Sequence, residues 1–415
     1  MALKDITALQ AQVKKDYEHG IVSADANTLI HKICFDSPQL TYMFSGFSYD
    51  RIHQVFGPES SGKSSLYTYI ASQLQKKMPE EMERLAKVFE DEGRKEEAEK
   101  YRKDFKDKQF VVYLDYEGTF DPNHAAQIGL NMDEDHFQLF HPDTIEEGFT
   151  MIEPFVKSGS VCCVIFDSDA LATTNLDNES DFGSTGFNGA KDAAVLAMVY
   201  KKFNVLCRNY LTPLLVVSQE RANMNVMSHL PSQTGGTAIK FAATTRNRVT
   251  KLDTLKNKDG VDAGIQMRVR NYKNKAGVPW RDAIMNLWFD GGFNSDDEYF
   301  DFFVIFDFIH KGAGGVYTAD FLPNGKIRGA EKVKEWIMSD DAKDIYNNLK
   351  EKVTQKLLGN NELDEDNINP EQDAETEKAD LSKIKVSIAE LADQALDISR
   401  GVETPTEESP DLGLE

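Results

Sequence analysis

Short apolar runs alternate with longer amphipathic segments from about Asp50 onward. Seven runs rich in Val, Ile, Phe and Tyr have the length of strands: residues 51–56, 110–114, 161–166, 214–218, 246–252, 267–272 and 283–289. Several of them lack strict alternation of apolar and polar residues, which is typical of strands covered on both faces. The pattern predicts an α/β core with a mostly parallel, twisted sheet flanked by helices, to which the closely spaced later runs add antiparallel strands.

Helical spacing marks three further parts of the chain. The stripe Leu3, Ile6, Leu9, Val13 and Tyr17 predicts a short leading helix that must dock on the main domain or on another subunit. Residues 78–108 predict a helical hairpin inserted on the core, and residues 330–338 and 342–358 predict two helices in a small C-terminal α/β module. We therefore expect an N-terminal oligomerisation segment (1–45), a core (46–300), the small module (301–358) and a tail (359–415).

The charge of the chain is unevenly distributed. The 47 Lys and Arg against 69 Asp and Glu give a net charge of −22, but residues 361–415 alone hold 17 acidic and four basic residues. That composition is typical of a disordered, solvated tail, in which residues 381–398 have the spacing of one short amphipathic helix. The rest of the chain is close enough to neutral to leave room for a local basic path.

Composition also indicates the cellular compartment in which the protein is expected. No stretch has the roughly 18–20 uncharged apolar residues that a membrane span needs, and the N-terminus lacks the apolar segment of a secretory signal. The four cysteines form no CxxC pair, which argues against zinc ribbons and disulfide scaffolds. Alternation along the strand places the adjacent Cys162 and Cys163 on opposite faces as inert core residues. We expect a cytoplasmic protein with no membrane contact.

One motif carries phosphate chemistry. Gly57-Pro58-Glu59-Ser60-Ser61-Gly62-Lys63-Ser64 fits GxxxxGK[ST], with a predicted strand before it and a helix after it. The glycines let successive backbone N–H groups face a phosphate, and the helix N-terminus adds positive potential. Lys63 is predicted to neutralise the β- and γ-phosphates of ATP, and the Ser64 hydroxyl to bind Mg²⁺.

Acidic and amide side chains stand at the ends of other predicted strands. Asp167 ends the uniform apolar run 161–166 and is placed to hold the magnesium shell. Glu117 is the candidate base for the attacking water, with Asp115 as its competitor, because the sequence does not show which carboxylate points inward. Gln219 ends a further strand, where it could sense the γ-phosphate.

These segments together resemble the RecA family of ATP-dependent homologous recombinases, most closely its bacterial members. The matching pieces follow in family order from about Ile52 to Pro279: the phosphate loop, Leu114-Asp115-Tyr116-Glu117 with Asp121-Pro122, Val164-Ile165-Phe166-Asp167-Ser168, Ser218-Gln219-Glu220-Arg221, Thr234-Gly235-Gly236-Thr237-Ala238-Ile239-Lys240-Phe241, and Lys273-Asn274-Lys275-Ala276-Gly277-Val278-Pro279. Six pieces in register are far more specific than any one of them. The resemblance implies a RecA-type P-loop NTPase core.

The resemblance also implies roles for single residues. It makes Glu117 the catalytic glutamate over Asp115, and Gln219 the residue that couples the γ-phosphate to a DNA-binding loop at residues 220–234, with a second such loop near 181–189. Residues that would contact single-stranded DNA are Arg221, Met224, Gly235, Gly236 and Lys240, while Ser65, Asp121 and His124 join the phosphate loop in holding ATP. Lys273 and Lys275 would reach the γ-phosphate of a neighbouring subunit, although without the resemblance a solvated loop is the better interpretation of both.

Three departures set this chain apart from the family pattern. The 51 residues from Ser64 to Asp115 exceed the usual connection, which identifies residues 78–108 as an addition. His124 stands where bacterial members place an aromatic ring on adenine, and Ser228 replaces a subunit-contacting phenylalanine. These departures and the long tail suggest a phage-encoded or otherwise divergent member, acting in a bacterium or in an infected host cell.

The sequence thus predicts a Mg²⁺- and ATP-dependent, DNA-stimulated ATPase that forms a head-to-tail helical filament on single-stranded DNA. It would pair that strand with homologous duplex DNA and exchange strands, with single-strand-binding or loading proteins as candidate partners. Two other functions stay open: a RecA-like ATP-binding mediator or paralogue without strand exchange, and a replicative helicase with the same core fold.

Overall fold

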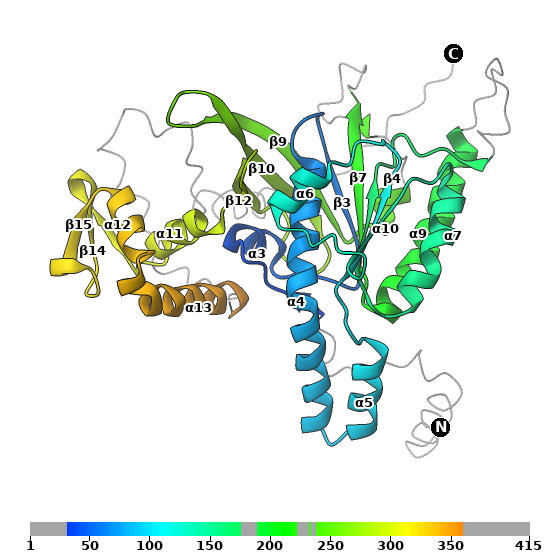
Figure 1. Cartoon of the computed structure of the whole chain (residues 1–415), viewed down its shortest axis with the longest axis horizontal. Coiled ribbons are helices and arrows are strands. Elements are labelled where there is room, and N and C mark those ends of the chain that lie inside the picture. Colours follow the sequence, from blue (N-terminus) through cyan, green and yellow to red (C-terminus); the bar gives the residue numbers. More distant parts are fainter. Residues whose placement is uncertain (1–30, 176–188, 222–231, 234–237, 360–415) are drawn as a thin grey trace, which may run out of the picture.

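The computed structural model describes residues 31–175, 189–221, 232–233 and 238–359 (Figure 1). The predicted leading helix, the loop near 181–189 up to residue 188, and the acidic tail from residue 360 lie outside the described residues. No helix in the described part of the chain is long and apolar enough to cross a bilayer.

A central sheet forms the middle layer of the molecule. Its ten described strands are β3 (Ile52–Gly57), β4 (Phe110–Asp115), β5 (Phe137–Phe140), β6 (Val161–Asp167), β7 (Leu214–Arg221), β8 (Ser232–Gln233), β9 (Thr245–Lys256), β10 (Asp262–Asn274), β11 (Asp282–Trp288) and β12 (Gly292–Phe293). The order is β12-β11-β10-β9-β3-β7-β6-β4-β5, with β8 paired to β7. The pairs from β9 through β3 to β5 are parallel and those from β9 to β12 are antiparallel. The predicted α/β core with a mostly parallel sheet is confirmed.

Helices cover both faces of the parallel part, which explains why its strands are apolar throughout. On one face pack α4 (Lys63–Asp91) and α6 (Pro122–Ile128), and on the other α7 (Ile145–Lys157), α9 (Gly189–Tyr210) and α10 (Ala238–Ala242). All seven residues of β6 are buried. The carboxyl ends of β3, β4, β6 and β7 therefore meet at one edge between two helical layers, the position at which parallel sheets bind ligands.

One irregularity changes the faces of the paired cysteines. Phe110 of β4 pairs with Val161 and the next residue, Val111, pairs with Cys163, so Cys162 is an extra residue in a bulge. Cys162 and Cys163 both belong to the hydrophobic cluster on the α4 face and are fully buried. The expectation of opposite faces was wrong because simple alternation fails at a bulge, while the expected burial holds.

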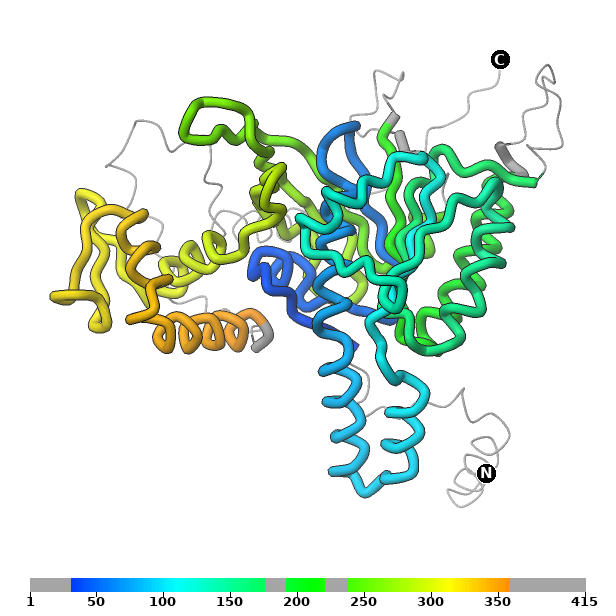
Figure 2. The backbone as a smooth tube through the Cα atoms, viewed as in Figure 1, coloured from blue at the N-terminus to red at the C-terminus, as the bar shows by residue number. Residues whose placement is uncertain are grey.

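The segment 78–108 forms an arm that projects from the body (Figure 2). The helix that starts at the phosphate loop continues without a break through Pro79 to Asp91, and α5 (Lys95–Asp104) folds back on it. Met82, Leu85 and Tyr101 pack inside the pair, and Arg102 of α5 forms ion pairs of 2.8 and 2.6 Å with Glu83 and Glu90 of α4. The arm is thus an extension of the P-loop helix itself.

The C-terminal module has its own hydrophobic cluster, which includes Tyr299, Phe303 and Ile337. It contains α11 (Ser295–Ile305), the three-stranded sheet β13 (His310–Gly312), β14 (Val316–Thr318) and β15 (Lys326–Arg328), α12 (Ala330–Ile337), α13 (Lys343–Gly359) and the short 3-10 turns η1 (Ala313–Gly315), η2 (Pro323–Gly325) and η3 (Asp340–Ala342). The two helices predicted near 330–338 and 342–358 are confirmed to within one residue at each end.

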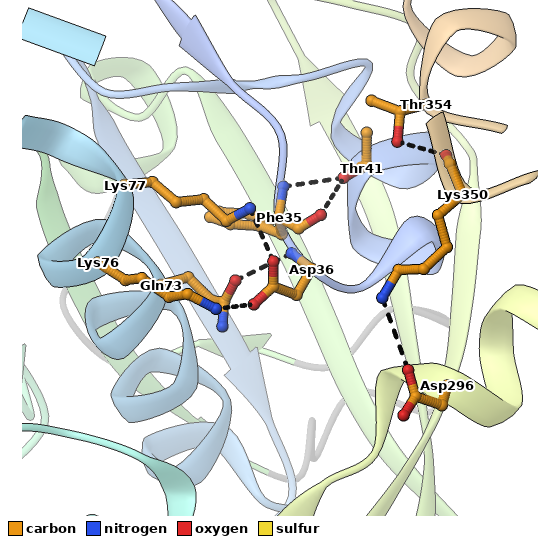
Figure 3. Close-up of polar contacts among 9 residues, drawn as sticks. All are labelled: Phe35, Asp36, Thr41, Gln73, Lys76, Lys77, Asp296, Lys350 and Thr354. Carbon is orange, nitrogen blue, oxygen red and sulfur yellow. Dashed lines mark hydrogen bonds and ion pairs between the residues drawn. The ribbon is translucent and has the colours of Figure 1, made fainter. Parts of the chain in front are cut away.

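Polar contacts join the module to the core through the small N-terminal elements β1 (Lys32–Ile33), α3 (Pro38–Phe44) and β2 (Phe47–Ser48). Asp36 lies between Lys76 and Lys77 of α4, at 3.0 and 2.7 Å (Figure 3). Hydrogen bonds and attraction from the two lysines, which overcome the opposing effect of burial, lower the pKa of Asp36 to about 2. Within the module, the Lys350 amine of α13 lies 3.6 Å from Asp296 of α11 (Figure 3). Between the module and the N-terminal elements, the buried Glu298 accepts a hydrogen bond of 2.5 Å from the Ser37 hydroxyl, which caps α3.

Candidate functional site

The phosphate loop lies between β3 and α4 and depends on close backbone approaches. At Gly57 (φ 155°) an added Cβ would come within 2.1 Å of the Val249 carbonyl oxygen. Gly62 (φ 90°) precedes the first residue of α4 in the left-handed conformation. The loop can therefore approach β9 only with glycine at position 57, and the left-handed conformation at position 62 favours glycine there. The loop leads into a helix N-terminus suited to an anion.

A cavity of about 670 Å³ opens over this loop. Its lining residues come from the loop and α4 (Glu59, Ser60, Ser61, Gly62, Lys63, Ser64, Ser65), from the ends of β4, β6 and β7 or just beyond (Glu117, Asp167, Val217, Gln219), from α6 (His124) and from the antiparallel strands or just after them (Lys251, Ile265, Leu287, Phe289). The structure thus brings together the predicted metal ligands Ser64 and Asp167 and three of the predicted catalytic residues, Lys63, Glu117 and Gln219. Its size and its mixture of charged and apolar lining suit a nucleotide.

Lys63 lies inside the loop. Its amine donates a hydrogen bond of 2.7 Å to the Pro58 carbonyl oxygen. Burial lowers the pKa of Lys63, and the nearby carboxylates of Asp167 and Glu117 oppose that effect. The amine thus lies inside the loop, in a cavity that the carboxylates of Glu59, Glu117 and Asp167 also line, where a lysine could neutralise a phosphate.

The two competing acids near the end of β4 have different surroundings. Asp115 is 3% exposed and accepts hydrogen bonds from three backbone N–H groups, those of Glu117 (3.0 Å), Gly118 (2.8 Å) and Phe120 (3.0 Å). Its carboxylate holds the turn together. Glu117 instead faces the cavity, where its Oε1 accepts hydrogen bonds from the Ser168 hydroxyl at 2.5 Å and from the Gln219 amide at 2.8 Å. Ser168 is a contact of Glu117 to which the sequence assigned no role.

Asp167 and Ser64 provide the candidate metal ligands. The Tyr113 hydroxyl donates to Asp167 Oδ2 at 2.7 Å, while the buried Oδ1 has no hydrogen-bond partner among the described residues. Burial above all, with repulsion from Glu117 and Asp115, raises the pKa of Asp167 to about 6 against the effect of its hydrogen bonds. A buried carboxylate oxygen without a partner fits Mg²⁺, which binds through one or two protein oxygens together with substrate phosphates and waters. Within the described ranges no cluster of three His, Cys, Asp or Glu offers a site made of protein ligands alone.

His124 lines the cavity from α6. Its Nε2 shares a hydrogen bond of 3.0 Å with the Ser65 hydroxyl, so Ser65 orients the imidazole. Asp121 caps α6 by accepting bonds from the backbone N–H groups of Asn123 and His124, and it does not line the cavity. Phe289, Ile265 and Leu287 supply apolar lining that the sequence analysis missed, because antiparallel strands carry no motif that points to a parallel-strand site.

Lys273 and Lys275 lie away from this cavity, on the side of α10. The Lys273 amine donates to the Lys240 carbonyl oxygen at 2.6 Å. Burial, then repulsion from Lys275 and Arg246, lowers the pKa of Lys273 to about 8. Lys275 lines a second cavity of about 970 Å³, together with Lys32, Arg51 and Lys201 and the single carboxylate Asp50. This face therefore concentrates positive charge on a chain that is acidic as a whole.

Several of the residues predicted to contact DNA lie outside the part of the chain that the structure describes. Met224, Gly235 and Gly236 lie outside the described residues, and Arg221 is described only as the last residue of β7. Of the five predicted DNA-binding residues, Lys240 alone has a described side chain, on α10 beside the Lys273 amine.

Comparisons with known proteins identify chains that this one resembles. The family model described as RecA N-terminal domain matches residues 100–294. Protein RecA of Rickettsia bellii (strain RML369-C) is 26% identical over 359 residues, which cover 85% of this chain and 93% of that protein. Protein RecA of Leptospira meyeri is 26% identical over 406 residues, covering 95% of both chains. A crystal structure of the RadB recombinase is similar at 18% identity and a TM-score of 0.40, covering 61% of this chain and 94% of that one. The family model and the relatives that match most of its length make this chain similar to proteins of the RecA family.

Proposed function

We propose that this protein is a DNA-dependent ATPase and recombinase, which assembles head to tail on single-stranded DNA and exchanges strands with homologous duplex. Similarity to RecA proteins over most of the chain supports the general class. The observation that carries the proposal is the hydrogen bond between Gln219 and Glu117, because Gln219 belongs to β7, the strand that leads into the candidate DNA-binding residues from Arg221 onward. A side chain next to the candidate DNA loop thereby touches the candidate catalytic base.

The cavity supports in-line hydrolysis of ATP. Lys63 and the backbone of the phosphate loop would bind the phosphates, and Ser64 and Asp167 would hold Mg²⁺, which neutralises charge on the phosphates when bound. Glu117 would orient and deprotonate the attacking water. Ser168 and Gln219 both donate to the same oxygen of Glu117, Oε1, so they fix the carboxylate without using its second oxygen.

The basic face supports contact with DNA and with a neighbouring subunit. Lys32, Arg51, Lys201 and Lys275 surround the larger cavity, where lysine and arginine would bind backbone phosphates without reading sequence. Lys273 and Lys275 have no carboxylate partner within the described residues. We assign to them the γ-phosphate of the neighbouring subunit, so that hydrolysis requires assembly.

Strand exchange between circular single strands and linear duplex tests the proposal. With ATP and Mg²⁺ the wild-type chain should form joint molecules and hydrolyse ATP faster when single-stranded DNA is present. Lys63→Ala should abolish nucleotide binding and both activities. Hydrolysis stimulated by DNA without joint molecules would favour the mediator, and processive unwinding of forked DNA would favour the helicase.

A further inference from the structure

Four polar side chains form a continuous hydrogen-bonded chain across the sheet, on the face covered by α9 and α10. Arg246 Nε donates to Gln54 Oε1, Gln54 Nε2 donates to Ser218 Oγ, and Ser218 Oγ donates to Asp169 Oδ2, each over 2.8 Å. Arg246, Gln54 and Ser218 belong to β9, β3 and β7, and Asp169 follows β6. The strands β9, β3, β7 and β6 are consecutive in the sheet, and Figure 1 labels the first three. We call these four residues the polar chain.

Three of the four members of the polar chain are buried, and its hydrogen bonds all donate toward Asp169. Gln54 and Ser218 are 0% exposed and Asp169 is 5% exposed. The Ser218 hydroxyl has one proton, and because Gln54 donates to its oxygen, that proton goes to Asp169. Asp169 Oδ1 has no hydrogen-bond partner among the described residues, so Ser218 is the side chain that holds this carboxyl group. Loss of one member would leave buried partners unsatisfied, which is costly in a protein interior.

One end of the polar chain lies directly behind the candidate base. Ser168 and Gln219, the two donors to Glu117, each adjoin a member of the polar chain, since Asp169 follows Ser168 and Ser218 precedes Gln219. The Asp169–Ser218 bond, together with a backbone hydrogen bond of 3.1 Å from Asp169 N to the Val217 carbonyl, ties the ends of β6 and β7 together. That tie sets the separation between the two donors and therefore the position of the Glu117 carboxylate.

The other end lies on the basic face. Arg246 packs over the Phe56 ring, with its guanidinium carbon 5.2 Å from the ring centroid, and it lies close enough to Lys273 for the two charges to repel. Lys273 in turn bonds the Lys240 carbonyl of α10. An anion that binds among these cations would relieve their repulsion and change the favoured position of the Arg246 guanidinium.

We propose that the polar chain Asp169–Ser218–Gln54–Arg246 couples binding of a DNA phosphate on the basic face to the placement of Glu117 in the nucleotide cavity. The proposal rests on the proposed function, because it takes the anion to be single-stranded DNA. None of the four side chains lines the nucleotide cavity, so they are positioning residues. They supply a route through side chains, separate from the backbone of β7 that leads from Gln219 to the candidate DNA loop.

Ser218→Ala tests the proposal because it breaks two of the three hydrogen bonds of the polar chain. ATP hydrolysis is measured with and without a poly(dT) oligonucleotide, and DNA affinity by fluorescence anisotropy. The DNA-stimulated kcat should fall at least about tenfold, while KM for ATP and Kd for DNA stay within about twofold of wild type. Ser218→Thr, which keeps the hydroxyl, should recover most of the stimulated rate. Ser72→Ala removes a buried hydroxyl that donates to the Tyr69 carbonyl oxygen within α4 and serves as the matched control.

An unchanged DNA-stimulated kcat in Ser218→Ala would overturn the proposal. A parallel loss of kcat, DNA affinity and thermal stability would also overturn it if Ser218→Thr does not recover them. If Ser218→Ala does not fold, Asp169→Asn and Asp169→Ala decide the matter, since only the first keeps an acceptor for Ser218, and equal rates in the two would refute the coupling. A wild-type protein whose hydrolysis ignores DNA would refute the proposed function itself. Stimulated wild-type hydrolysis with an unaffected Ser218→Ala would refute the coupling alone.

Discussion

Asp115 and Glu117 stand two positions apart, and substitution should affect each in a different way. Asp115→Ala removes the acceptor of three backbone hydrogen bonds in a side chain that is 3% exposed. A hydrogen bond to a charged group contributes about 1.5–3 kcal/mol, and water entering the emptied turn would offset part of the loss, so we expect unfolding to become easier by about 3–5 kcal/mol. Two of the donors belong to Glu117 and Gly118, so the turn that carries Glu117 should loosen and hydrolysis should fall as well.

Glu117→Gln should leave stability nearly unchanged and strongly reduce ATP hydrolysis. The amide has the shape of the carboxylate and keeps an oxygen to accept from Ser168 and Gln219, so stability should change by less than about 0.5 kcal/mol. Loss of a general base costs about 10²–10⁴ in kcat, which corresponds to about 3–5 kcal/mol in the barrier. Binding of ATP should be unaffected, and filaments should form without turning over ATP.

The assays are urea unfolding and steady-state ATP hydrolysis on both variants, with Asp115→Asn as a control. That control keeps one oxygen for the Glu117 and Gly118 N–H groups but places a donor opposite the Phe120 N–H, so its loss of stability should lie between wild type and Asp115→Ala. Wild-type hydrolysis by Glu117→Gln would refute the assignment of the base. Unchanged stability in Asp115→Ala would refute the structural role of Asp115.

Three further outcomes are expected. Burial raises the pKa of Glu298 to about 8 from a usual value of 4.5. Between pH 4.5 and pH 8 the folded protein therefore holds a proton on Glu298 that the unfolded chain has lost. The stability that this proton contributes is present at low pH and disappears as the pH rises toward 8. Glu298→Gln should therefore lose less stability than wild type between pH 5 and pH 8 in urea unfolding, and parallel declines would contradict this. His124→Tyr should tighten ATP binding about two- to tenfold through better stacking on adenine. Affinity is measured with a fluorescent nucleotide, and Ser65→Ala is compared as a control. Equal affinity in His124→Tyr and wild type would mean that the base does not stack at this position. Deletion of residues 361–415 should raise affinity for single-stranded DNA roughly tenfold at low salt, with the difference fading as salt increases, and identical binding curves across a salt titration would make the tail a solubilising appendage.

Local pattern was sufficient to predict most of the core. The strands at 51–56, 110–114, 161–166 and 214–218 were found because burial on both faces makes them apolar throughout. β5 (Phe137–Phe140) was missed because a four-residue edge strand is too short for a periodic signal. The paired cysteines were assigned to opposite faces because a bulge at Cys162 depends on the register of β4 against β6, which no single strand encodes.

The residues of the candidate site also divide into those that the sequence predicts and those that only the structure identifies. The sequence by itself determined the residues whose chemistry follows from a motif: the phosphate loop, Lys63, Ser64, and acids at the carboxyl ends of strands. It could not separate Asp115 from Glu117 without the family resemblance, since that choice depends on which backbone N–H groups a carboxylate meets after the turn has closed. Only the tertiary structure decided that Asp115 is occupied by its own turn, that Ser168 and Gln219 converge on Glu117, and that Arg246, Gln54, Ser218 and Asp169 form one chain across four strands. These residues lie up to 192 positions apart, and hydrogen bonds over such separations arise from strand order and register, which are properties of the assembled sheet.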